Sequence, residues 1–385
     1  MSVLPAPNPD AAAHSARVSA FLRDEIQRAG GWISFARYME LALYAPGLGY
    51  YAAGSVKFGP AGDFITAPEL TPLFGRSLAH CFADVLTTLG QAADIVELGA
   101  GSGRLAVDLL AELDRLGVLP ARYLILEPSA ELKERSRERI ATLPARLAER
   151  VGWLDRLPDT LQGIVFGNEV LDALPVHLLL RQGASFLERG VVVTPQGFAW
   201  QDRPCDDTAL VNEAAALALP EGYVIELHRA AGALLRSLAE RLAAGLILFI
   251  DYGFGRAEYY HPQRAQGTLM VHYRHHAHAD PFLWPGLSDL TAHVNFTAIA
   301  EAGLAAGLEL AGYTSQAAFL LDCGITDLLA QIPVSDMVRY AQQAQAVGKL
   351  LSPAEMGELI KVIALGRGLE GPVRGFALRD ARHRL

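Results

Sequence analysis

The chain has 385 residues, of which 51% are hydrophobic and 19% charged, so the sequence predicts one large domain or two smaller ones with a sizeable core. Its 33 basic and 42 acidic residues give a net charge of −9, which argues against a general nucleic-acid or membrane-surface binder. The cysteines form no Cys-x-x-Cys pair, which fits a reducing compartment and argues against a disulfide framework or a thiolate zinc site; they are Cys81, Cys205 and Cys323.

Targeting and membrane segments are not expected. Met1–Ala13 contains no basic stretch followed by an apolar core, so the sequence predicts no signal peptide. The most apolar run, Gly245–Ile250, is too short to span a bilayer. We therefore expect a cytoplasmic protein without membrane insertion, with a mitochondrial location only if the source is eukaryotic.

The first 75 residues are expected to form two helices followed by an irregular segment. The helices are predicted over Ser15–Ala29 and from Ser34 to about Leu43. Residues 44–51 and 57–69 are rich in Gly, Pro and aromatic residues and lack periodicity. A long irregular segment in a compact domain is usually functional or disordered, and the aromatic content disfavours disorder. We interpret this region as an ordered cap over a ligand site, with a plain surface loop as the alternative.

The stretch Asp94–Gly103 predicts the first half of a nucleotide-binding βαβ unit. A buried strand over Ile95–Leu98 leads into a glycine turn, and a helix begins near Arg104. Glu97 followed by Gly99, Gly101 and Gly103 is the loop pattern typical of S-adenosylmethionine (SAM) methyltransferases. The last two of these glycines together with Ala106 also fit the pattern used for NAD or FAD. The glycines alone leave both cofactors open.

Two carboxylates refine this prediction. Glu97 favours SAM, because a carboxylate at the end of the strand can face the cationic amino-acid part of SAM but would repel a pyrophosphate. Arg122–Glu127 reads as the second strand, and Glu127 follows the last loop glycine by about 24 residues. A nucleotide-binding fold places the acid that holds the ribose hydroxyls at this position.

The rest of the chain continues the alternation of strands and helices. Further strands are predicted at Val151–Trp153 and Gly163–Asn168, followed by an antiparallel insertion over about 176–225. A helix over His228–Ala243 leads to the strand that ends at Asp251, and two late strands, 308–313 and 360–365, are expected to pair antiparallel and close the sheet.

Polar residues recur where these strands end. Glu97, Glu127, the pair Asn168-Glu169 and Asp251 each lie at the carboxyl end of a predicted strand. Ligands of open α/β sheets bind outside the carboxyl ends of the strands, so we expect the site there.

The histidine cluster between residues 272 and 278 does not predict a metal site. It lacks the helical His-Glu-x-x-His arrangement, and no acidic residue stands at a clear ligand spacing. The chain also has no Gly-x-Ser-x-Gly elbow and no phosphate-binding Gly-x-x-x-x-Gly-Lys-Ser/Thr loop, which argues against hydrolases and nucleoside triphosphatases.

Six segments together resemble the MidA family of SAM-dependent methyltransferases, which includes a mitochondrial complex I assembly factor that methylates a protein arginine. They span most of the chain in order, at residues 38–51, 62–69, 96–103, 167–176, 251–253 and 280–294. The first segment and Asn168-Glu-Val-Leu-Asp-Ala-Leu-Pro175 are more specific than the glycine loop.

The resemblance implies an α/β fold: a Rossmann-like methyltransferase core with a seven-stranded, mostly parallel sheet. It divides the chain into a helical N-terminal cap over the cofactor site (1–75), the core with its inserted strands (76–255) and a C-terminal part with substrate-side loops and the strands that complete the sheet (256–385). It implies SAM as cofactor, a protein arginine as acceptor and a role in complex I assembly. We also consider a homodimer, and expect no nucleic-acid partner.

Site roles follow as hypotheses. The loop with Gly99, Gly101 and Gly103 would hold the methionine part of SAM and Glu127 its ribose. Trp153 would flank the adenine, and the remaining cofactor residues are Glu97, Asn168, Asp63 and Thr66. Glu169 and Asp172 would orient a guanidinium through paired, charge-assisted hydrogen bonds, and His293 would be a base or line the acceptor pocket.

Two other functions stay open on the sequence. One is an NAD-dependent oxidoreductase, suggested only by the Gly-x-Gly-x-x-Ala coincidence. The other is a non-catalytic SAM-binding protein that assists the assembly of a partner. A nucleic-acid methyltransferase is disfavoured because Asn-Glu-Val-Leu-Asp stands where base-amino methyltransferases carry Asn/Asp-Pro-Pro-Tyr/Phe.

Overall fold

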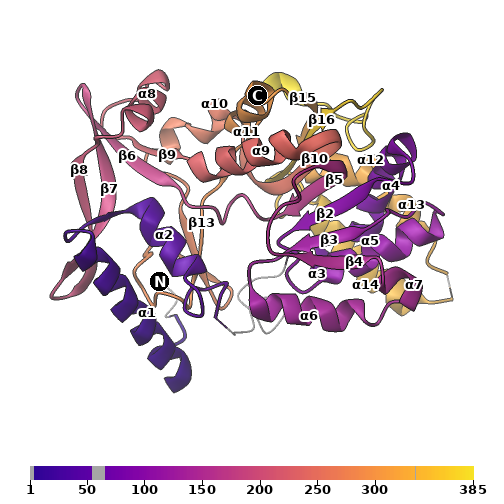
Figure 1. Cartoon of the computed structure of the whole chain (residues 1–385), viewed down its shortest axis with the longest axis horizontal. Coiled ribbons are helices and arrows are strands. Elements are labelled where there is room, and N and C mark those ends of the chain that lie inside the picture. The colour runs from indigo at the N-terminus through magenta and orange to yellow at the C-terminus, as the bar shows by residue number, and fades with distance from the viewer. Residues whose placement is uncertain (1–3, 54–65, 334) are drawn as a thin grey trace. The chain divides into compact units, whose positions relative to one another are not determined.

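A computed structural model describes residues 4–53, 66–333 and 335–385 of the chain (Figure 1). Its contacts group the chain into two compact units. Unit 1 comprises Met1–Phe64, Asp172–Ala233 and Arg256–Asn295, and unit 2 comprises Ile65–Leu171, Leu234–Gly255 and Phe296–Leu385. This grouping differs from the division expected from the sequence, because residues 256–295 belong with the N-terminal helices and the insertion rather than with the C-terminal strands.

Unit 2 is built around the predicted mostly parallel sheet. Its strands follow the order β15-β16-β10-β5-β2-β3-β4. The strands from β4 to β10 pair in parallel, while β16 is antiparallel to both β10 and β15. This confirms the seven-stranded core closed by an antiparallel pair. The bounds are β2 Asp94–Leu98, β3 Tyr123–Leu126, β4 Val151–Leu154, β5 Leu161–Asn168, β10 Leu242–Phe254, β15 Glu309–Ser315 and β16 Ile360–Arg367.

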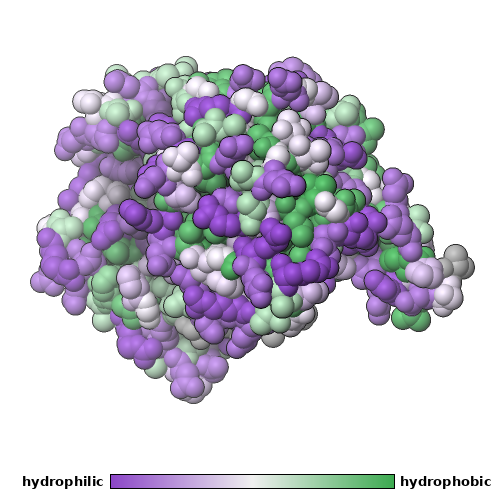
Figure 2. All heavy atoms as spheres, turned by 45° about the vertical axis from the view of Figure 1, so that its right-hand side comes forward, coloured by the Kyte–Doolittle hydropathy of each residue, from purple (hydrophilic) through white to green (hydrophobic). Residues whose placement is uncertain are grey.

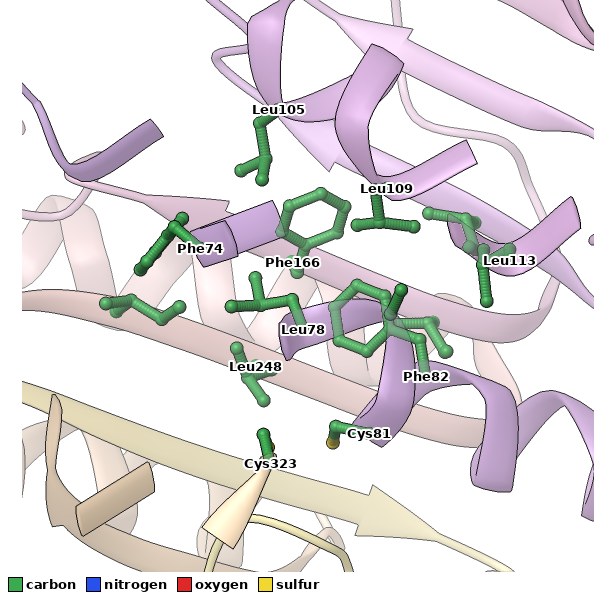
Figure 3. Packing of buried hydrophobic residues seen from close by; sticks show 14 of the residues in the cluster. Phe74, Leu78, Cys81, Phe82, Leu105, Leu109, Leu113, Phe166, Leu248 and Cys323 are labelled. Carbon is green, nitrogen blue, oxygen red and sulfur yellow. The ribbon is translucent and has the colours of Figure 1, made fainter. Parts of the chain in front are cut away.

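The helices of unit 2 cover this sheet, and two of them form much of its core. Apolar residues of α4 (Pro72–Leu89) and α5 (Arg104–Arg115) meet Phe166 of β5 and Leu248 of β10 (Figure 3). Three further helices of unit 2 were predicted: α6 Ala130–Ile140, α11 Phe296–Ala305 and α12 Gln316–Asp322. Five were not predicted: α3 Ala67–Leu70, α7 Ala145–Ala148, α13 Ile325–Ala330, α14 Met337–Leu351 and η2 Arg382–Arg384. Helix α9, Arg229–Arg241, crosses from unit 1 into unit 2.

Two glycines allow three neighbouring strands to approach closely. Gly163 of β5 pairs with Asp94 of β2 on one side and with Gly245 of β10 on the other. A Cβ on Gly163 would lie 1.9 Å from the Asp94 carbonyl oxygen, and one on Gly245 would lie 1.8 Å from the Gly163 carbonyl oxygen. Their φ angles of 144° and 136° also suit glycine. These positions therefore require glycine for the three strands to pair at this point.

Unit 1 contains the predicted antiparallel insertion. The strands β1 (Ile33–Ser34), β7 (Ser185–Thr194), β6 (His177–Gln182) and β9 (Val224–Leu227) follow one another in this order, and β8 (Gly197–Pro204) pairs with β7. All of these pairs are antiparallel. Antiparallel pairing lets consecutive strands connect through short turns, as the glycine punctuation of the sequence indicated.

Both predicted N-terminal helices are present in unit 1, and the first one begins earlier than predicted. Helix α1 covers Pro9–Arg28 and begins before the predicted Ser15, because the Asn8 side chain accepts the Ala11 N–H and caps the helix. Helix α2 covers Phe35–Tyr44, with Ser34 as the predicted N-cap.

The remaining elements of unit 1 are α8 Thr208–Ala216, α10 Arg256–Tyr259, η1 Pro262–Arg264, β11 Met270–Tyr273, β12 His276–His278, β13 Asp289–Thr291 and β14 Val294–Asn295.

The histidine cluster lies along the β11–β12 hairpin. Arg274 and His275 form its turn with φ angles of 46° and 62°, as a two-residue hairpin of this type requires. Among the residues that the structure describes, no three His, Cys, Asp or Glu side chains gather where they could hold a metal ion.

The face drawn in Figure 2 is largely hydrophilic, with apolar residues in scattered patches. In the described part of the chain, no helix combines the length and apolarity needed to cross a membrane.

Candidate functional site

The glycine loop after β2 turns through three left-handed residues. Gly99, Gly101 and Gly103 have φ angles of 63°, 52° and 75°, which side-chain-bearing residues rarely adopt. A Cβ on Gly103 would lie 2.9 Å from the backbone of Ser136, so this glycine lets α6 pack against the loop. In the sheet, β2 lies between β3 and β5. The loop therefore lies between the residues that follow those two strands.

Glu127 follows β3 and contacts the loop directly. One carboxylate oxygen accepts the Gly101 N–H at 3.1 Å, and the other accepts the Ser129 N–H at 2.9 Å. The side chain is buried, with 7% of its surface exposed. A carboxylate oxygen can accept more than one hydrogen bond, so this geometry is compatible with contacts to ribose hydroxyls. The predicted ribose role of Glu127 stays a prediction.

Asn168 ends β5 on the other side of the loop. Its amide nitrogen donates to Glu169 at 3.0 Å, while its Oδ1 is buried and has no hydrogen-bond partner among the described residues. A buried acceptor without a partner costs about 1–3 kcal/mol, so Oδ1 suits a ligand that brings an N–H donor. The ammonium group of a SAM methionine part is such a donor, and the predicted cofactor role of Asn168 fits this arrangement.

The turn that follows Asn168 is held in an uncommon conformation. Glu169 has a φ of 53°, although it is not a glycine. Asp251, fully buried in β10 directly after its last parallel pair with β5, accepts the N–H groups of Val170 and Leu171 at 3.1 and 2.7 Å; β10 continues to Phe254 instead of ending at Asp251 as predicted. These bonds offset the strain of the turn. Asp251 was expected among the polar groups that face the ligand. In the structure it supports the backbone that carries Glu169.

Glu97 is the most perturbed carboxylate of unit 2. Only 2% of the residue is exposed, and its Oε2 accepts the Tyr123 hydroxyl at 2.7 Å. Burial raises the pKa of Glu97 to about 8, and the nearby charge of Glu127 adds to the increase. The hydrogen bond from Tyr123 lowers this pKa but does not cancel the effect of burial. A cation nearby would favour the ionised form, so the predicted contact with the amino-acid part of SAM stays chemically reasonable.

Trp153 of β4 lies against α6. Its indole nitrogen donates to the Ser136 hydroxyl at 3.0 Å, and the guanidinium carbon of Arg137 lies 5.1 Å from the ring centroid. These contacts fix the indole plane. The role of Trp153 beside the adenine is not tested by them and stays a prediction.

A polar cluster at the glycine loop was not predicted in full. Ser102 donates a hydrogen bond to Glu69, and Arg139 reaches both Ser102 at 3.0 Å and Glu69 at 3.4 Å. Glu69 was expected only as part of the irregular segment, and Ser102 and Arg139 were not predicted. Ser102 stood at a variable position of the glycine pattern, so only its place inside the loop could have indicated it.

The remaining predicted site residues are Thr66, Asp63, Asp172 and His293. Thr66 is buried at the start of α3, and Asp63 lies outside the described residues. Asp172 and His293 belong to unit 1. Asp172 is buried, and its carbonyl accepts the Ala292 N–H at 2.9 Å. Burial lowers the pKa of His293 to about 4, assisted by Arg264 and His272, so the imidazole is neutral at pH 7.

The geometry is thus a glycine loop flanked by Glu127 and Asn168, on a seven-stranded sheet. Residues 77–314 match the family model described as "Putative S-adenosyl-L-methionine-dependent methyltransferase". The chain belongs to this family. The loop, the strand-end acids and the sheet therefore form a SAM-dependent methyltransferase core, as predicted, and the family resemblance drawn from the sequence is confirmed.

A solved structure supports the same assignment. The chain is similar to a protein from Burkholderia thailandensis whose crystal structure contains S-adenosyl-homocysteine; the two are 52% identical, with a TM-score of 0.96 and 100% of each chain covered. S-adenosylmethionine is the cofactor of this family, and the NAD-dependent alternative is overturned. The Gly-x-Gly-x-x-Ala match was a coincidence of glycine spacing within the longer Glu-x-Gly-x-Gly-x-Gly pattern.

The names of more distant relatives also specify the methyl acceptor. The mouse protein named "Protein arginine methyltransferase NDUFAF7, mitochondrial" is 29% identical over 92% of this chain and 86% of its own length. The rat protein of the same name is 30% identical over 87% of this chain and 81% of its own length.

Proposed function

We propose that this SAM-dependent methyltransferase transfers the methyl group to a nitrogen of an arginine side chain in a protein. The observation that carries the proposal is the turn at Glu169, which Asp251 holds in a left-handed conformation at the carboxyl end of β5. Strained backbone of this kind collects at functional sites. The names of the arginine methyltransferase relatives, which match most of the chain, support the choice of acceptor.

SAM supplies a methyl group already activated on a sulfonium. The residues of the chain then have to position the acceptor and exclude water. In the proposal, Glu169 forms charge-assisted hydrogen bonds with the guanidinium, a group whose planar donors match a carboxylate. Asp172, three positions further along, assists it, and the neutral imidazole of His293 is able to accept a proton or an N–H.

The proposal extends to location and partners. The relatives are named mitochondrial. A role in assembling respiratory complex I, which the family resemblance implies, predicts that the acceptor is a subunit of that complex. In a bacterial source the corresponding place is the cytoplasm. A homodimer also stays a prediction.

A labelled-methyl assay tests the proposal. An extract from a strain that lacks the protein is incubated with methyl-labelled SAM and the purified protein, and mass spectrometry then locates the mark. We expect a mono- or dimethylated arginine. Label on another residue type would overturn the arginine assignment, and no label on any protein would favour the non-catalytic assembly function.

Substitution of Glu169 tests the site itself. Glu169→Gln removes the charge but keeps the size, so SAM affinity measured by calorimetry should stay within about twofold while transfer falls by about 100-fold or more. The matched control is Glu149→Gln at an exposed position of the same unit, which should leave both unchanged. Unchanged transfer by Glu169→Gln would remove Glu169 from the mechanism.

A further inference from the structure

A second polar network is buried in unit 1, around Glu226 of β9. Its carboxylate is 1% exposed and accepts two backbone N–H groups, from Thr268 at 2.7 Å and Leu269 at 3.0 Å. The Thr268 hydroxyl donates to the other oxygen at 2.7 Å. A Cβ on Gly267 would come within 2.5 Å of the carboxylate, so the glycine allows the chain to wrap around it.

This network continues to a histidine. The Tyr259 hydroxyl lies 2.5 Å from Glu226 Oε2 and 2.9 Å from His228 Nε2. The chain of contacts is therefore Glu226, Tyr259, His228, and all three residues are buried. A buried polar network lowers the stability of a protein if any of its polar atoms has no hydrogen-bond partner.

The network defines the tautomer of His228. Tyr259 has one hydrogen, and its short contact to the carboxylate indicates that this hydrogen is donated to Glu226. The phenol oxygen then accepts a hydrogen from His228 Nε2. His228 Nδ1 consequently carries a lone pair rather than a hydrogen.

That lone pair has no partner among the described residues. His228 is 7% exposed, and its Nδ1 is buried without a hydrogen bond. The opposite nitrogen is anchored through Tyr259 to a carboxylate, which increases the strength of Nδ1 as an acceptor. Burial lowers the pKa of His228 to about 4, and His293 contributes, so the ring is neutral.

His293 belongs to the same network. Its backbone N–H donates to the Thr268 hydroxyl at 2.9 Å, and the Thr268 hydroxyl donates to Glu226. The groups that face the two imidazoles are Tyr259 and His293 for His228, and Arg264 and His272 for His293. The His228 ring and the His293 backbone are thus both connected to one buried carboxylate.

We propose that His228 Nδ1 is a hydrogen-bond acceptor for a guanidinium N–H of the protein substrate, held ready by Tyr259 and Glu226. The inference rests on the proposed function for the identity of the substrate. A guanidinium fits because it brings several N–H donors and no acceptor. His228 is then a substrate-binding residue of unit 1.

Nitrogen NMR of the intact protein tests the binding site without activity. In protein labelled with ¹⁵N in histidine, His228 is assigned from the signal lost in His228→Gln. We expect a protonated Nε2 and an unprotonated Nδ1, and a saturable shift of the Nδ1 signal on addition of N-acetyl-arginine amide. A protonated Nδ1, or no shift at saturating probe because the site holds a bound water only, would overturn the proposal.

Variants separate the acceptor atom from the network. Gln can replace the Nε2 donor toward Tyr259 but has no atom equivalent to Nδ1, so His228→Gln should raise the KM for the methylated protein by about tenfold or more while the SAM affinity stays unchanged. Tyr259→Phe releases the tautomer and should raise the same KM. The control, His275→Gln at the exposed hairpin turn, should have no effect.

The two proposals fail in different ways. If the wild-type protein labels no arginine, the proposed function is wrong, and the probe titration still decides whether unit 1 binds a guanidinium. If the wild-type protein labels arginine while His228→Gln retains the wild-type KM, only the role of His228 is wrong.

Discussion

Three acidic residues at the carboxyl ends of strands in unit 2 have different environments and so different chemistry. Asp251 is fully buried, and its carboxylate accepts hydrogen bonds from two backbone N–H groups of the Glu169 turn. Glu127 accepts one N–H from the glycine loop and one from Ser129. Glu97 is buried beside Tyr123, and its pKa is raised to about 8. Position at a strand end therefore does not by itself define a role; the local donors do.

The raised pKa of Glu97 predicts a pH-dependent stability. Between pH 4.5 and about 8 the folded protein holds a proton on Glu97 that the unfolded chain has lost, so the free energy of unfolding falls as the pH rises through this window. Each unit of pKa shift corresponds to about 1.4 kcal/mol. Glu97→Gln removes the effect and should become more stable than the wild-type protein as the pH rises from 5 to 9.

Urea unfolding of both proteins at several pH values measures this difference. The gain of the Gln variant should grow up to about pH 8 and then level off. A gain that does not depend on pH would show that Glu97 is ionised in the folded protein.

The left-handed backbone of Gly101 predicts that the loop tolerates no β-branched residue. Its φ is 52°, and its N–H donates to Glu127. Gly101→Val should abolish SAM binding in calorimetry while the protein stays folded. The control is Gly117→Val, where φ is 74° and the space for a Cβ is open, at the other end of α5. If the control lost SAM binding too, backbone strain rather than the loop would be responsible.

At the scale of elements, the sheet depends on close approach at its starting edge. Asp94, Gly163 and Gly245 lie side by side on β2, β5 and β10, and a Cβ on either glycine would collide with a neighbouring carbonyl. The buried aliphatic residues further along the strands form the core with α4 and α5 (Figure 3). The strand ends that carry Glu127 and Asn168 are positioned by this pairing.

Gly163→Ala should therefore destabilise the protein strongly. The obstacle is the backbone of Asp94, which cannot move without breaking the β2–β5 pair, so we expect a loss of about 3 kcal/mol or more in the free energy of unfolding. Gly117→Ala, with open space and a similarly positive φ, should cost only about 1 kcal/mol. Equal losses in urea unfolding would mean that the sheet adjusts to the extra methyl group.

At the scale of the whole molecule, the described residues predicted to bind the cofactor and most of those predicted to bind the acceptor belong to different units. The described residues of the predicted cofactor site, from Thr66 to Asn168, lie in unit 2, whereas Asp172, His228 and His293 lie in unit 1. A ligand stabilises the part of a protein to which it binds, in proportion to its affinity and concentration.

Hydrogen exchange with and without SAM tests this division. Peptides that cover the ends of β2, β3 and β5 should exchange at least about tenfold more slowly with SAM, while peptides of β6 and β7 in unit 1 should change little. Uniform protection of both units would contradict the assignment of the cofactor site to unit 2.

Much of the cofactor site follows from the sequence alone. The glycine loop after a buried strand, the acid that follows the next strand and the positions of the core strands along the chain could all be predicted, because hydrophobic periodicity and glycine spacing are local properties. They led to the SAM-dependent methyltransferase core that the comparisons confirm. The antiparallel insertion was readable from its alternation and turn glycines.

Only the tertiary structure decided which distant residues meet. Ser102 and Arg139 join Glu69, Asp251 holds the turn at residues 169–171, and Tyr259 connects Glu226 to His228. Residues 256–295 likewise group with the N-terminal helices. These contacts join positions 31 or more residues apart. No local pattern encodes them, because they depend on long-range packing, and they decide which buried polar groups find partners.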